Sequence, residues 1–89
     1  MLFRSGDRAA AEEAISHYRL ALDLSRETPR CRAAVLENLA LLQAAVGNFA
    51  LALGAFEERD KLPWIDARDE LRHRVEKART YYQLERREE

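Results

Sequence analysis

The stretch Leu41–Asp60, "LLQAAVGNFALALGAFEERD", decides the fold, because Gly47-Asn48 interrupts an apolar run of helical character. Inside a helix, glycine costs about 1 kcal/mol relative to alanine. Directly after a helix, by contrast, glycine is the favoured residue in the left-handed conformation, and asparagine is a good N-cap for the next helix. We therefore predict two helices joined by a tight turn, over about 29–46 and 48–61.

The remainder of the chain also follows helical spacing, and no segment alternates with a period of two. A first helix is predicted over about 8–26. Thr28-Pro29 then marks the start of the second helix as an N-cap followed by proline at the first helical position. Pro63 is predicted to begin a fourth helix, with Asp66 in its first turn. The expected core positions are Ala11, Ala14, Ile15, Tyr18, Ala21 and Leu22, then Val35, Leu36, Leu39, Leu42 and Val46, then Phe49, Ala52, Leu53 and Phe56.

Length and composition limit the class of protein. The 89 residues make one small domain, and 47% hydrophobic content argues against disorder. A net charge of -1 gives no general attraction to nucleic acid or to an anionic membrane. The chain has no apolar run of about 20 residues and no signal-peptide pattern, and Cys31 is its single cysteine. We expect a cytoplasmic protein without a disulfide.

Two residues of the first helix recur in the third. Ala14 and Tyr18 return 38 residues later as Ala52 and Phe56, a small residue followed by an aromatic ring one turn on. Such recurrence is typical of stacked helical hairpins, although a generic helical bundle also places apolar residues at helical spacing. The pattern resembles the tetratricopeptide repeat family over about residues 9–63. The matching positions are Ala14, Tyr18, Ala21, Leu36, Leu39, Ala40, Gly47, Phe49, Ala52, Phe56 and Pro63, whereas Gln43 and Arg59 depart from the motif.

The resemblance implies an all-α fold of antiparallel helical hairpins, stacked as a short right-handed α-solenoid of about four helices. It also implies a concave groove that binds a protein or peptide partner. Asn38 matches an asparagine that hydrogen-bonds ligand backbone in some members, although asparagine is also common at that position for no such reason. The groove residues carried over from the family are Ala34, Glu37, Asn38, Leu41 and Ala45.

No catalytic constellation stands out, and we expect neither an enzyme nor a bound metal or cofactor. Glu70-x-x-His73 has the spacing of half a di-iron site, but a second such pair is missing, so a charged solvent-facing helix surface is the preferred interpretation. Cys31 lies near a helix N-terminus between two arginines, which favours a thiolate. No base or second cysteine accompanies it, so we interpret it as a structural or incidental residue.

The last segment is highly charged and carries a thin apolar stripe, formed by Leu71, Val75, Ala78 and Tyr82. The stripe is expected either to cover the last repeat as a cap, which we prefer, or to begin a coiled-coil connector. "KARTYYQLERREE" is also similar to linkers in bacterial signalling proteins.

We therefore expect three parts: a disordered or non-native tail over 1–7, repeats over 8–62 and a C-terminal helix over 63–89. The predicted function is a protein–protein interaction scaffold that binds neither nucleic acid nor membrane. The alternative is a homo-oligomer formed through the Ala/Tyr stripe of the first helix.

Overall fold

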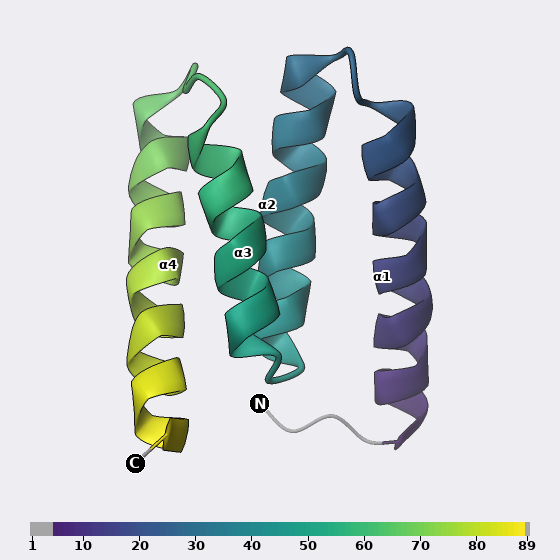
Figure 1. Ribbon diagram of the computed structural model, residues 1–89, viewed down its shortest axis with the longest axis vertical. Helices are drawn as coiled ribbons and strands as arrows, with labels where there is room; N and C mark the ends of the chain where they lie inside the picture. The colour runs from purple at the N-terminus through teal and green to yellow at the C-terminus, as the bar shows by residue number, and fades with distance from the viewer. Residues whose placement is uncertain (1–4, 89) are drawn as a thin grey trace.

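The computed structural model describes the backbone of residues 5–88 and the side chains of residues 8–86. Four helices make up this part of the chain: α1 (Ser5–Leu24), α2 (Pro29–Ala45), α3 (Phe49–Asp60) and α4 (Ala67–Glu88). Successive helices run antiparallel (Figure 1), in a body of 35 × 26 × 20 Å. The predicted all-α fold of four helices in antiparallel hairpins is confirmed.

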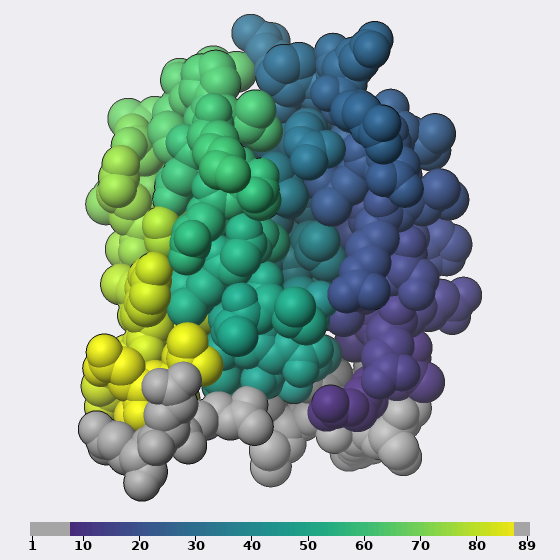
Figure 2. Space-filling model, viewed as in Figure 1, coloured from purple at the N-terminus to yellow at the C-terminus, as the bar shows by residue number. Residues whose placement is uncertain are grey.

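Helix α2 is the centre of the arrangement. It packs against both α1 and α3, and it also contacts α4, which packs mainly on α3. The connections 25–28 and 61–66 lie at one end of the molecule and the turn 46–48 lies at the other (Figure 1). In the space-filling view, α1 and α4 stand on opposite sides of the α2–α3 pair (Figure 2).

The turn between α2 and α3 has the geometry that the sequence predicts. Gly47 has a φ of 92°, in the left-handed region. Its N–H donates to the carbonyl of Ala44 (3.1 Å), and the N–H of Asn48 donates to the carbonyl of Gln43 (2.9 Å). These two bonds form a Schellman motif. Asn48 does occupy the N-cap position, but its side chain makes no capping bond and donates instead to Gln43 Oε1 (2.8 Å).

Close contact between α2 and α3 creates the core. Ala40, Ala52 and Phe56 are completely buried, so the two alanines let the helices approach while the ring fills the space beside them. Leu36 and Leu39 are buried as predicted. The remaining predicted core positions of α2, Val35, Leu42 and Val46, are only half-buried.

Helix α1 covers the other side of α2. Ala11 and Ile15 are buried, and the rest of the predicted stripe (Ala14, Tyr18, Ala21 and Leu22) is half-buried. The helix begins at Ser5. Residues 5–7 are therefore helical, and the prediction that they belong to a disordered tail is wrong. Residues 1–4 lie outside the described residues.

The predicted start of the fourth helix at Pro63 is wrong. Helix α4 begins at Ala67, and Asp66 is its N-cap rather than part of its first turn: Asp66 Oδ1 accepts a bond from the N–H of Arg68 (2.8 Å). The cause lies on α3, because Arg59 donates to the carbonyl oxygens of Leu62 (3.0 Å) and Pro63 (3.4 Å) and holds this segment outside a helix.

The apolar stripe of α4 faces solvent, so the expectation that it covers the last repeat is also wrong. Leu71 is 65% exposed, Val75 45% and Tyr82 60%. The buried face of α4 is instead polar, and its most buried residues are His73 and Thr80. Carboxylates on α2 and α3 attract this face, as described below.

Candidate functional site

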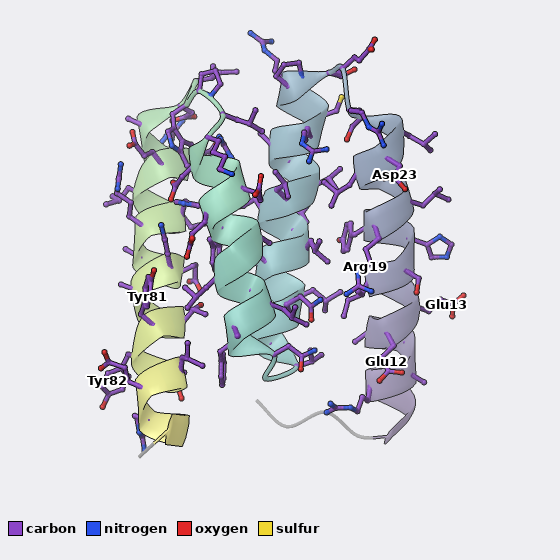
Figure 3. The ribbon with its side chains drawn as sticks, viewed as in Figure 1. Glu12, Glu13, Arg19, Asp23, Tyr81 and Tyr82 are labelled. Atoms are coloured by element: carbon purple, nitrogen blue, oxygen red, sulfur yellow. The ribbon has the colours of Figure 1, made fainter. Side chains whose placement is uncertain are left out.

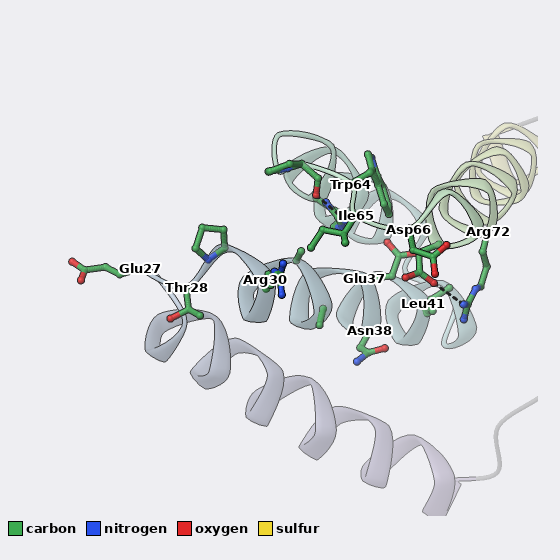
Figure 4. Close-up of a pocket in the computed structure, with 16 residues that line it drawn as sticks. Glu27, Thr28, Arg30, Glu37, Asn38, Leu41, Trp64, Ile65, Asp66 and Arg72 are labelled. Atoms are coloured by element: carbon green, nitrogen blue, oxygen red, sulfur yellow. Dashed lines mark hydrogen bonds and ion pairs between the residues drawn. The ribbon is translucent and has the colours of Figure 1, made fainter.

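A hollow of about 830 Å³ lies between α2 and the connection from α3 to α4. Arg30, Asn38 and Leu41 of α2 line one side, and Trp64 and Ile65 line the opposite side (Figure 4). Its volume is within the range of ligand pockets, about 300–1,000 Å³. The loop 63–66, whose non-helical course the sequence did not predict, therefore forms one wall of the site.

Four of the five predicted groove residues line this hollow. Ala34 and Asn38 are exposed, whereas Glu37 and Leu41 are half-buried. Ala45 does not reach it. Ala45 lines a second hollow of about 750 Å³, between the end of α2 and the second half of α4, which shares Leu41 with the first. We call the two hollows together the α2 groove. It follows one face of α2 from Pro29 to Ala45, and the two hollows meet at Leu41.

Arg59 holds the side chain of Trp64 in place in the wall of the hollow. The Arg59 side chain is nearly buried, at 6% exposure of the residue, and its guanidinium lies 3.5 Å from the centre of the Trp64 ring. Together with the two carbonyl bonds to the loop, this cation–π contact holds the indole in place. Arg59 is one of the two departures from the repeat motif, and sequence alone gave no role to it.

A charged cluster, made of Glu37, Asp60, His73 and Lys77, packs next to the groove. His73 is fully buried, and its ring nitrogens face one carboxylate each. Nδ1 is hydrogen-bonded to Glu37 Oε1 (2.7 Å), and Nε2 lies 2.8 Å from Asp60 Oδ1, an ion-pair distance that lacks hydrogen-bond geometry. The ring also makes edge contacts with Phe56 (5.2 Å between centres) and Trp64 (4.8 Å). One buried side chain thus joins α2, α3, α4 and the loop.

Both ring nitrogens of His73 lie close to a carboxylate oxygen, Nδ1 beside Glu37 and Nε2 beside Asp60. A neutral imidazole carries one N–H and an imidazolium carries two, so the ring can donate to at least one of these carboxylates. Glu37 also lines the α2 groove, so His73 holds a side chain of the groove in place.

Lys77 also pairs with Asp60. Its Nζ lies 2.6 Å from Asp60 Oδ2. Burial raises the pKa of the Asp60 carboxyl, but the hydrogen bond from Lys77 and the charge of His73 outweigh it and hold this pKa below its ordinary value. Asp60 therefore remains ionised beside Lys77.

The other candidates from the sequence do not join this cluster. Glu70 binds Arg74 (2.8 Å) at the surface, as its spacing predicts, so the solvent-face interpretation is right for Glu70 and wrong for His73. Cys31 and His17 are exposed. Within the described side chains, no group of three or more His, Cys, Asp and Glu could hold a metal ion.

Comparison with known proteins gives no relative. No family model matches the chain, and neither the curated proteins nor the solved structures contain a match. Among the helices described, none has the length and apolar character needed to cross a membrane.

Proposed function

We propose that this chain is a non-catalytic interaction module that binds a peptide or a helix of a partner protein in the α2 groove. The observation that carries the proposal is the continuity of the two hollows along α2, because Leu41 lines both of them. A groove along one helix, with a tryptophan in its wall, suits a ligand that is longer than a small molecule.

The groove offers both apolar surface and a polar side chain that can select the ligand. Leu41, Trp64 and Ile65 offer apolar surface, and Ile65 is 70% exposed in the absence of a ligand. Asn38 is exposed and can both donate to and accept from a ligand backbone. Binding energy would come from covering the apolar residues, and Asn38 would set the register of the ligand.

The resemblance to tetratricopeptide repeats supports the same proposal. In that family the first helix of each hairpin lines the groove, and α2 is the helix that carries the matching residues. Helix α4 contacts α2 beside the groove, as the first helix of a following hairpin would. On this proposal the chain is one complete hairpin, α2 with α3, between two further helices.

Selection from a random peptide library tests this function. A displayed library is panned against the chain and then depleted against Leu41→Glu, a substitution that places a charge where the two hollows meet. We expect peptides that bind the chain and Leu51→Glu but not Leu41→Glu. Leu51 is a matched control, since it is an exposed leucine (56%) on α3 that lines neither hollow. If every selected peptide survives the Leu41→Glu depletion, the groove is not the binding site.

Homo-oligomerisation remains the second candidate, and one observation favours it. Leu20 and Leu24 lie one turn apart on α1 and are 56% and 80% exposed. The Ala/Tyr stripe itself is half-buried against α2, so self-association would use this neighbouring leucine pair. Light scattering after size exclusion distinguishes the candidates: a monomer excludes the oligomer, and a dimer that Leu24→Glu dissociates supports it.

A further inference from the structure

Helix α4 presents an apolar stripe to solvent on the side turned away from α3. The stripe consists of Leu71, Val75, Ala78 and Tyr82, at steps of four, three and four, and Tyr82 lies at its far end (Figure 3). At about 1.5 Å per residue it is about 16 Å long, the length of three helical turns. Leu71, Val75 and Ala78 line neither hollow of the α2 groove, whereas Tyr82 also lines the second hollow, so the stripe meets the groove at this end.

Four arginines follow one edge of this stripe. They are Arg68, Arg72, Arg79 and Arg86, at steps of four, seven and seven, which keep one helix side. The side chains of Arg68, Arg72 and Arg79 are 90%, 68% and 72% exposed. Arg72 and Arg79 pair only with acids one turn back on their own helix, Asp69 (3.0 Å) and Glu76 (3.2 Å). Such exposed pairs are worth about 0–1 kcal/mol and exchange readily for another carboxylate.

We propose that this outer face of α4 binds an amphipathic helix of a partner protein whose flanking residues are acidic. The 4–3–4 spacing of the stripe is the spacing of a coiled-coil seam, which selects a helix as the occupant. The row of arginines at the edge of the seam selects carboxylates in the partner. The inference does not depend on the proposed function of the α2 groove.

The same charges argue against a second copy of α4 as the occupant. In an antiparallel pair of identical helices the arginine row would face itself. In a parallel pair it would face the opposite edge, which carries Arg74 and Tyr81. Neither arrangement supplies the arginines with acids, and like charges across a seam are destabilising.

A pair of synthetic helices tests the proposal. The first is a labelled three-heptad peptide with leucine at the seam positions and glutamate at both flanks, and the second carries lysine in place of each glutamate. Fluorescence anisotropy measures the binding of each to the whole chain. We expect the glutamate peptide to bind at least about tenfold more tightly than the lysine peptide, with an affinity that falls as salt rises.

Substitutions then locate the binding surface. Val75→Glu and Leu71→Glu should each weaken binding of the glutamate peptide by about tenfold or more, whereas Leu51→Glu should leave it unchanged. Leu51, Leu71 and Val75 are all exposed, so circular dichroism of the three variants should show an unchanged helical content. Leu41→Glu should also bind normally, and this result separates the α4 surface from the α2 groove.

Three results would overturn the proposal. The first is no binding of the glutamate peptide, or equal binding of both peptides. The second is unchanged binding by both Val75→Glu and Leu71→Glu. The third is a different occupant: self-association that Val75→Glu abolishes would identify a second copy, and sedimentation with phosphatidylserine vesicles that Val75→Glu abolishes would identify a membrane.

Discussion

Replacement of His73 by alanine tests the structural account most severely at a single position. The substitution removes the buried imidazole between Glu37 and Asp60 and leaves both carboxylates without this partner. Loss of one partner from a buried ion pair costs about 3–5 kcal/mol. The side chains of Glu37 and Asp60 retain 21% and 30% of their exposure, so water relieves part of that cost. We expect His73→Ala to lower the free energy of unfolding by about 2–4 kcal/mol.

Urea denaturation at neutral pH, followed by far-UV circular dichroism, measures this loss. His17→Ala is the matched control, because the His17 side chain is 75% exposed and lies 3.9 Å from Glu13, and its removal should leave the midpoint unchanged. A domain of this size has a total stability of about 4–13 kcal/mol, so the difference between the two variants should be large. Equal midpoints for His73→Ala and His17→Ala would refute the buried cluster.

His73→Phe separates charge from packing. Phenylalanine keeps a ring beside Phe56 and Trp64 but supplies no charge to the carboxylates. If charge dominates, His73→Phe should lose at least half as much stability as His73→Ala in the same titration. Full restoration of stability by phenylalanine would show that packing of the ring, and not the contacts of its nitrogens with the carboxylates, holds the helices together.

Four further substitutions test the turn, helix α3, the charged cluster and the loop. Gly47→Ala should destabilise by about 1–2 kcal/mol because φ is positive there, whereas Gly54→Ala, with no atom near its new Cβ, should stabilise helix α3 by about 0.5–1 kcal/mol in urea titrations. Since the pKa of Asp60 is lowered on folding, its stabilisation is present above about pH 4 and is lost as pH falls below that; Asp60→Asn should flatten the dependence of unfolding free energy on pH in this acid range. Arg59→Lys should lose the forked contact with the loop, which lowers stability by about 1–3 kcal/mol and shifts the emission of Trp64 to longer wavelength.

The features that the sequence predicts correctly are those that depend on neighbouring residues in the chain. The turn at Gly47 and the start of α2 at Pro29 follow from backbone preferences of single residues, and both are found where the sequence places them. The buried Ala52 and Phe56 follow from helical spacing and from their recurrence in the chain. Four of the five groove residues line one hollow because they share a face of α2.

Tertiary charge pairing accounts for what the sequence did not predict. Helix α4 has an apolar and a polar face, and hydrophobicity alone predicts that the apolar face turns inward. The polar face is buried instead because His73 contacts Glu37 and Asp60 and Lys77 contacts Asp60, and these partners are 13–36 positions apart in the chain. The predicted helix start at Pro63 is wrong for a related reason. The buried side chain of Arg59 binds the carbonyl oxygens of Leu62 and Pro63 and keeps this segment in a loop. No local pattern marks such long-range partners.

The affinity of a selected peptide for the chain and for Leu41→Glu shows directly whether the α2 groove is the binding site. Trp64 is the single tryptophan and lines the α2 groove, so its fluorescence reports occupancy during a peptide titration. We expect the peptide to change the Trp64 emission and Leu41→Glu to raise Kd by about tenfold or more, whereas Leu51→Glu and Val75→Glu should leave Kd unchanged. An unchanged Kd for Leu41→Glu, with its helical content intact, would exclude the α2 groove as the binding site.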